Sequence, residues 1–124
     1  MLETERLYLR KIETSDDVAM FELDSNPEVC TYLGNKPVKD MEEIRSIIQM
    51  IHKQYEENGI GRWAVIEKAS NNFIGWSGLK LVKEPINNQV NFYDLGYRFM
   101  PRYWNKGYAS EAAKAWIDFA FNEL

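Results

Sequence analysis

The stretch that decides the fold is residues 94–112, DLGYRFMPRYWNKGYASEA. Its apolar first part favours a strand, Pro101 ends that strand because proline has no amide hydrogen, and the alanine-rich end favours a helix. A short loop that contains Gly107 joins the two. In this order, backbone N–H groups and the positive end of a helix point towards one place, which is an arrangement that binds phosphate. The stretch therefore predicts a phosphate site between a strand and a helix.

The first third of the chain predicts a strand followed by helices. Apolar and polar residues alternate over Leu7–Arg10, which indicates a strand. Thr14 or Ser15 is expected to cap a short helix with acidic residues in its first turn. That helix should end before Pro27, and another turn or two is expected over residues 28–33.

The middle and end of the chain predict one long helix, three strands and a last helix. Asp40 with Glu43 forms a capping pattern, and Gly59 stops the helix that follows. Three strands joined by short loops are expected at residues 63–66, 73–82 and about 90–99, and they should form an antiparallel meander. An apolar face begins at Ala109 and continues to the end of the chain. The predicted class is α+β, with a mostly antiparallel sheet flanked by helices in the order β-α-α-β-β-β-α.

Composition limits the classes of protein to which the chain can belong. With 124 residues, of which 45% are hydrophobic, we expect a single globular domain over residues 1–124. A net charge of −4 with scattered basic residues argues against a nucleic-acid partner. No apolar run suits a membrane span or a signal peptide, and Cys30 has no partner for an internal disulfide. These features favour the cytoplasm.

Familiar nucleotide loops and nucleophile arrangements do not occur in the sequence. There is no G-x-x-x-x-G-K-[ST] and no G-x-G-x-x-G after a strand, so those two phosphate sites are unsupported. No Ser/His/Asp or Cys/His arrangement is evident, and no metal is expected. His52 lies beside the apolar stripe of a helix and is interpreted as a half-exposed surface residue. Trp63 and Trp76 either line a groove or pack in the core, and the core is the commoner place for them.

The loop resembles the acetyl-coenzyme A loop of the GNAT N-acetyltransferase superfamily, whose motif is [QR]-x-x-G-x-[GA]. Gly107 and Ala109 match its last two fixed positions, while Trp104 stands where Gln or Arg is usual. The phrase YWNKGYASEA at 103–112 is similar to the RimJ/RimL-type branch, residues 2–10 are similar to the first strand of that branch, and residues 73–79 are similar to its third. The resemblance covers the whole chain.

This resemblance implies roles for the residues of the loop and of the strand before it. Backbone N–H groups of the loop would hold the pyrophosphate of acetyl-coenzyme A, and the strand end would bind the pantetheine arm and polarise the thioester carbonyl. The side chains of Asn105, Lys106 and Ser110 could add hydrogen-bond donors. The residues expected to bind the coenzyme are Phe99, Met100, Trp104, Asn105, Lys106, Gly107, Tyr108, Ala109 and Ser110.

Asp94 is the candidate catalytic base for the incoming amine. Its sequence neighbours are mostly apolar, and such surroundings would raise the pKa of its carboxyl group. Water-mediated deprotonation is common in the superfamily, so the resemblance does not require this role. The alternative is a structural aspartate that is hydrogen-bonded to Arg98 or to a neighbouring strand. The sequence does not separate the two.

The resemblance also implies parts that this sequence lacks. Superfamily members usually continue with further strands and a helix whose tyrosine protonates the thiolate, so these C-terminal strands are expected to be absent here. The chain is then a truncated piece, a subunit of a homo-oligomer whose partner covers the open strand, or a degenerate domain. The expected function is N-acetyl transfer from acetyl-coenzyme A to a protein N-terminus or a small amine, by direct attack in a ternary complex. The alternative is a non-catalytic or truncated acyl-coenzyme A-binding or assembly module.

Overall fold

The fold is built on one antiparallel sheet. The computed structural model describes residues 2–29, 38–59, 61–82 and 92–123. The strands lie in the sheet in chain order and are β1 (Leu2–Glu3), β2 (Leu7–Lys11), β3 (Arg62–Glu67), β4 (Asn72–Val82) and β5 (Phe92–Phe99). Every neighbouring pair is antiparallel, so the predicted meander is confirmed. As the last strand in this order, β5 forms one edge of the sheet.

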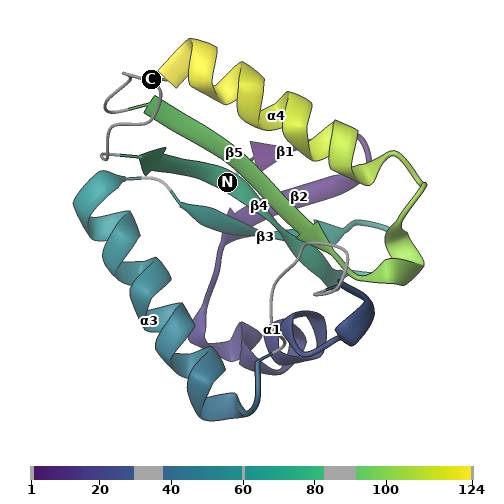
Figure 1. The fold of residues 1–124 in the computed structure, drawn as a ribbon. Helices are drawn as coiled ribbons and strands as arrows, with labels where there is room; N and C mark the ends of the chain where they lie inside the picture. The colour runs from purple at the N-terminus through teal and green to yellow at the C-terminus, as the bar shows by residue number, and fades with distance from the viewer. Residues whose placement is uncertain (1, 30–37, 60, 83–91, 124) are drawn as a thin grey trace.

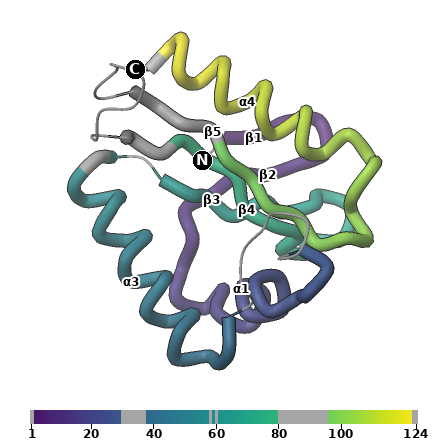
Figure 2. The backbone as a smooth tube through the Cα atoms, in the orientation of Figure 1, coloured from purple at the N-terminus to yellow at the C-terminus, as the bar shows by residue number. Residues whose placement is uncertain are grey.

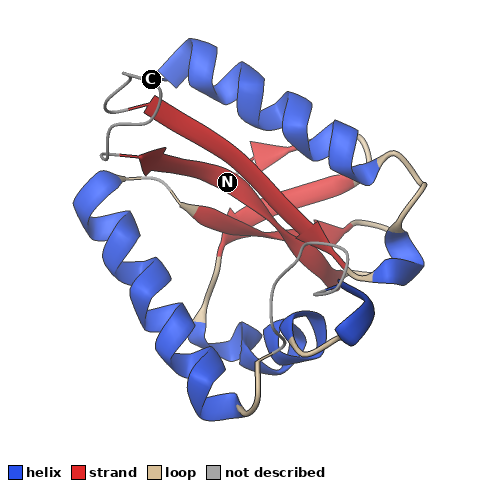
Figure 3. Ribbon diagram, viewed as in Figure 1, coloured by secondary structure: helices blue, strands red, loops and turns tan. Residues whose placement is uncertain are grey.

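Helices cover both faces of the sheet, as the α+β prediction requires (Figure 3). The helical segments are η1 (Thr14–Asp16), α1 (Asp17–Asp24), α3 (Met41–Asn58), η2 (Pro101–Tyr103) and α4 (Tyr108–Glu123), and residues 27–29 are also helical. Figure 1 shows α4 on one side of the sheet and α1 with α3 on the other. Among the described residues, no helix is long and apolar enough to cross a membrane.

The start of the first helix differs from the prediction. The helical region begins as η1 after Glu13, and neither Thr14 nor Ser15 caps it. Instead the Asp16 carboxylate accepts a hydrogen bond of 2.8 Å from the backbone N–H of Glu13. The same carboxylate receives two hydrogen bonds from Arg10 in β2, at 2.8 and 2.9 Å. The N-cap of η1 is therefore Glu13, and Asp16 at the third helical position closes a capping box with it while it also pairs with Arg10 of β2.

The ends of α3 agree with the sequence. Asp40 accepts a hydrogen bond of 2.9 Å from the Glu43 N–H. At the other end Gly59 adopts a left-handed conformation with φ 73°, and its N–H bonds to the Tyr55 carbonyl at 2.9 Å. The Tyr55 hydroxyl accepts from the Ile12 N–H at 3.1 Å and donates to a backbone carbonyl in β3. This hydroxyl fastens α3 to the sheet.

The core between the sheet and α4 is aromatic. The Trp63 ring meets the Trp116 ring edge-on at 5.0 Å between centroids, and the Trp116 indole N–H donates to the Ser77 hydroxyl at 3.0 Å. Both tryptophans are buried, so Trp63 packs in the core. Trp76 is also buried, with the Arg62 guanidinium 4.5 Å from its ring centroid. Cys30 and most of residues 28–33 lie outside the described part of the chain.

Candidate functional site

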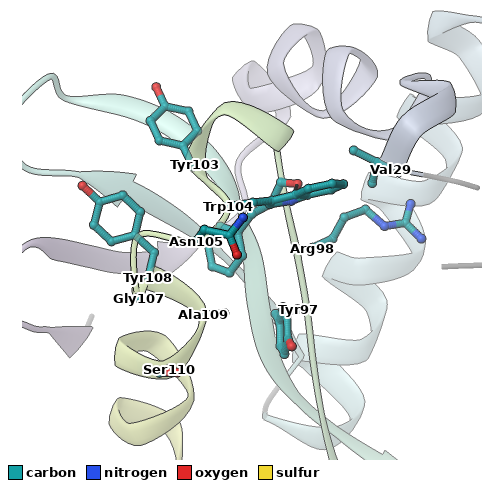
Figure 4. Close-up of a pocket in the computed structure, with 11 residues that line it drawn as sticks. Val29, Tyr97, Arg98, Tyr103, Trp104, Asn105, Gly107, Tyr108, Ala109 and Ser110 are labelled. Carbon is teal, nitrogen blue, oxygen red and sulfur yellow. Dashed lines mark hydrogen bonds between the residues drawn. The ribbon is translucent and has the colours of Figure 1, made fainter. Parts of the chain in front are cut away.

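A cavity of about 410 Å³ lies where β5 ends and α4 begins. Figure 2 shows the chain turning back at this end of the sheet, so that α4 returns beside β5. Figure 4 shows the residues around the cavity. The residues that line it are Val29, Tyr97, Arg98, Phe99, Tyr103, Trp104, Asn105, Gly107, Tyr108, Ala109 and Ser110.

The turn before α4 leaves a run of backbone donors without protein acceptors. Asn105 and Gly107 both have positive φ, at 62° and 81°, which asparagine and glycine tolerate better than other residues. The first N–H of α4 that bonds back to the turn is that of Glu111, which reaches the Gly107 carbonyl at 3.0 Å. Within the described residues, the N–H groups of Asn105 to Ser110 reach no backbone or side-chain acceptor. Left-handed residues next to a helix N-terminus form a concave set of donors that suits an anion.

The open edge of β5 adds a donor at Phe99. The Met100 N–H bonds to the Ile74 carbonyl at 3.0 Å, and Phe99 lies opposite Gly75. This pattern makes Phe99 a non-hydrogen-bonded position, so its N–H and C=O point away from β4 towards the edge. The alternation continues back along the strand, so Tyr97 and Leu95 also face outward. Met100 is buried and its donor is engaged, which leaves Phe99 as the donor at the strand end.

Trp104 forms the middle of the site. Its indole N–H donates to the outward-facing Phe99 carbonyl at 2.7 Å, which ties the turn to the strand end. In Figure 4 the indole extends from the turn towards Val29 and Arg98. Trp104 stands where the superfamily motif usually has Gln or Arg, and here it connects the two parts of the site and partly fills the space between them.

Among the described residues that line the cavity, the charged side chain is Arg98, and Asp24 of α1 holds it in place. The guanidinium Nη1 lies 2.8 Å from the Asp24 carboxylate, and both side chains are largely buried. Burial raises the pKa of the Asp24 carboxyl group above its ordinary value, and the charge and hydrogen bond of Arg98 only partly oppose this. Among the described residues, the partner of Arg98 is therefore Asp24.

The structure gathers most of the predicted coenzyme-binding residues around the cavity, but two of them lie outside its lining. Met100 is buried, and Lys106 is exposed with its backbone carbonyl bonded to Arg6 at 2.9 Å. His52 is half-buried, as expected, and its Nε2 lies 2.7 Å from a backbone carbonyl at the end of β2. No group of side chains that could hold a metal is found within the described residues.

Asp94 lies in β5 opposite Lys80, and its side chain falls outside the described part. A strand advances about 3.3 Å per residue, so Asp94 lies roughly 16 Å along the strand from Phe99. Asp94 and Phe99 therefore occupy separate positions along β5.

Sequence reasoning missed several lining residues. Tyr97, Arg98 and Tyr103 belong to the decisive stretch, but their side chains were not assigned to the site. Val29 lies about seventy residues away in sequence, in the helical residues 27–29 that follow α1, and it reaches the cavity only through tertiary packing, so no local signal could have indicated it.

Comparison with known proteins gives a consistent result. Residues 6–124 match the family described as acetyltransferase (GNAT) domain. An uncharacterized N-acetyltransferase of Bacillus licheniformis, p20, is 36% identical over 123 residues, which are 99% of this chain and 67% of p20. The crystal structure of a GNAT-family acetyltransferase from Bacillus anthracis matches with a TM-score of 0.76 and 29% identity, covering 98% of this chain and 66% of that one.

A more distant structure shares the fold and carries ligands. Spermidine N-acetyltransferase from Vibrio cholerae, in complex with CoA and spermine, matches with a TM-score of 0.72 and 22% identity over 97% of this chain and 66% of that one. At this identity the likeness concerns the fold alone. The chain thus spans about two thirds of the length of the relatives that it matches.

Proposed function

The chain belongs to the GNAT acetyltransferase family, and from that membership we propose that it transfers the acetyl group of acetyl-coenzyme A to a primary amine. The acceptor class is a protein N-terminus or a small amine such as a polyamine. The RimJ/RimL-type branch is the part of the family to which we assign it, on the phrase at 103–112. The observation that carries the proposal is the row of unpaired N–H groups from Asn105 to Ser110 beside the cavity.

These donors suit a diphosphate better than they suit a neutral ligand. Each unpaired N–H contributes a partial positive charge, and the N-terminus of α4 adds the positive end of its dipole. The described lining residues include no carboxylate that would repel an anion, and the charged one among them is Arg98. A diphosphate bound here would leave the rest of the coenzyme free to follow the edge of β5.

The pantetheine arm would then extend along β5 towards Asp94. Its amide groups could pair with the outward N–H of Phe99 and with the outward N–H and C=O of Tyr97, as an added strand would. An outward N–H further along β5, such as that of Leu95, would stabilise the negative charge that develops on the thioester oxygen. This arrangement brings the acetyl group near Asp94 and away from the turn.

The chemical step is direct attack. The nitrogen lone pair of the neutral amine attacks the thioester carbon, the C–S bond breaks, the nitrogen loses a proton and the thiolate of coenzyme A gains one. We propose that Asp94 accepts the proton of the ammonium form, either directly or through water. Holding both substrates side by side supplies much of the rate, and no covalent enzyme intermediate is needed.

Titration calorimetry with acetyl-coenzyme A tests the binding half of the proposal. We expect binding by the wild type and its loss in Gly107→Glu, which places a carboxylate and a strained backbone at the turn. Gly59→Glu is the matched control, because Gly59 also has a positive φ and open space around it but lies at the end of α3. Absence of wild-type binding, or equal binding by all three proteins, would remove the argument.

Thiol detection across an amine panel tests the transfer half. Release of coenzyme A that depends on the amine would support the transferase. Binding without release from any amine would instead favour the second function, an acyl-coenzyme A-binding module. Binding and transfer are measured separately because the chain spans about two thirds of the length of its relatives, so binding of the coenzyme does not by itself establish transfer.

A further inference from the structure

A cluster of contacts holds the turn from the side away from the cavity, and it is centred on Arg6, in the link between β1 and β2. The Arg6 guanidinium donates to the Lys106 carbonyl at 2.9 Å and to the Glu111 carboxylate at 2.7 Å. Its Cζ lies 4.4 Å from the Tyr108 ring centroid. One side chain therefore contacts the turn, the first residue of α4 and the first turn of that helix, about a hundred residues further along the chain.

Glu111 fixes the orientation of this guanidinium. Its second carboxylate oxygen accepts the backbone N–H of Arg6 at 2.9 Å and the hydroxyl of Thr4. Burial disfavours the charged form of Glu111, but the hydrogen bonds from Thr4 and Arg6 outweigh it and hold the pKa of this carboxyl below its ordinary value. Glu111 is therefore ionised at neutral pH, and it accepts hydrogen bonds from both the backbone N–H and the guanidinium of Arg6.

The contact with Lys106 decides which way the next peptide faces. In a trans peptide the C=O of one residue and the N–H of the next point in opposite directions. Because the Lys106 carbonyl points to Arg6, the Gly107 N–H points away from Arg6. Gly107 lines the cavity, whereas neither Arg6 nor Lys106 does. Arg6 thus holds the 106–107 peptide from the side away from the cavity, with the Gly107 N–H on the side of the anion site.

Because residue 107 is glycine, the peptide before it needs a contact that fixes its orientation. Gly107 can adopt other backbone conformations at little cost, and a flip of the 106–107 peptide would turn a carbonyl oxygen towards the phosphate. We propose that Arg6 is a positioning residue, which holds the 106–107 peptide so that its N–H faces the diphosphate of the coenzyme. This inference rests on the proposed function, and Arg6 itself need not touch the ligand.

The test compares two ligands that differ by the diphosphate. Coenzyme A is titrated by calorimetry, and pantetheine, which lacks the diphosphate, is titrated by amide chemical shifts. Arg6→Gln should raise the Kd for coenzyme A about tenfold, equivalent to ~1.4 kcal/mol, and leave the Kd for pantetheine unchanged. Arg10→Gln is the matched control, because Arg10 lies in the adjoining β2 and loses an ion pair of 2.8 Å to Asp16 away from the cavity.

Glu111→Gln separates positioning from a direct effect of charge. If Arg6 acted only as a positive charge near the phosphate, removal of the neighbouring negative charge would tighten binding of coenzyme A. Positioning predicts weaker binding, by several fold, because the guanidinium loses its charged partner. Tighter binding by Glu111→Gln would overturn the proposal.

The remaining outcomes are also decisive. Binding of coenzyme A by Arg6→Gln within twofold of the wild type would refute the proposal, as would an equal loss for both ligands. If Arg6→Gln does not fold, Arg6→Lys replaces it, since lysine keeps the charge but lacks the fork that joins Lys106 to Glu111. Weaker coenzyme A binding with unchanged pantetheine binding then supports the proposal, and wild-type behaviour refutes it. Failure of the wild type to bind coenzyme A would instead refute the proposed function.

Discussion

Replacement of Gly107 by alanine separates backbone strain from added charge, and Gly59→Ala is its matched partner. Both glycines have left-handed backbones, with φ of 81° and 73°. A left-handed alanine costs about 1–2 kcal/mol. The stiffer unfolded chain of the variant returns about 0.4–1 kcal/mol, so each variant should lose roughly 1 kcal/mol of unfolding free energy. In a chain of this length that loss corresponds to a fall in Tm of about 4 °C.

The surroundings of the two positions differ. A Cβ at Gly59 would meet nothing within 4 Å, whereas a Cβ at Gly107 would lie 3.3 Å from the Arg6 guanidinium. That guanidinium is 44% exposed and can move, but movement would weaken its bond to the Lys106 carbonyl. Gly107→Ala should therefore be the less stable of the two, by a fraction of a charge-assisted hydrogen bond, about 1 kcal/mol or less after screening by solvent.

Affinity for coenzyme A is the deciding readout. Thermal unfolding should show both variants folded, and calorimetry should give an unchanged Kd for Gly59→Ala and a Kd about tenfold higher for Gly107→Ala, the equivalent of ~1.4 kcal/mol. Equal Kd values for the wild type and both variants would refute the reasoning, since the turn would then be irrelevant to the coenzyme. An equal loss of affinity in both variants would refute it too, because the effect would follow from stability alone.

Three further predictions concern the strand end, the sheet and the base. Trp104→Phe removes the 2.7 Å bond to the Phe99 carbonyl, and we expect the KM for acetyl-coenzyme A to rise about fivefold with the free energy of unfolding reduced by about 1 kcal/mol, measured by steady-state kinetics and urea unfolding. Burial, the largest cause, raises the pKa of Tyr55 to about 12. The neutral hydroxyl therefore contributes its full stabilisation below pH 10 and loses it as the pH rises from 10 to about 12. Absorbance at alkaline pH should show this late titration in the wild type and not in Tyr55→Phe. Asp94→Asn should slow transfer more at low pH than at high pH, where the free amine is abundant, and a pH–rate profile parallel to that of the wild type would clear Asp94 of a base role.

The parts of the fold that depend on residues close together in the chain could be predicted from the sequence. The turn after Pro101, the caps of α3 at Asp40 and Gly59 and the meander of β3 to β5 all follow from spacings of a few residues. The strand Leu2–Glu3 was not predicted, because two residues are too few to show an alternation. The N-cap at Glu13 was missed for another reason, since its capping-box partner Asp16 is held by Arg10 of β2, a tertiary contact.

The candidate site divides in the same way. The turn and its donors were predicted from one continuous stretch, and the structure places most of those residues around one cavity. The engaged N–H of Met100 follows from the register of β5 against β4, which no sequence pattern revealed. Arg6 and Val29 reach the turn and the cavity through tertiary packing alone.

Amide chemical shifts measured during titration with coenzyme A test the central claim most directly. If the turn binds the diphosphate, the N–H signals of Asn105 to Ser110 will move on addition of coenzyme A and will stay in place on addition of pantetheine, which should move the signal of Phe99 instead. Signals of the turn that remain unchanged while coenzyme A binds would place the diphosphate elsewhere and contradict the claim.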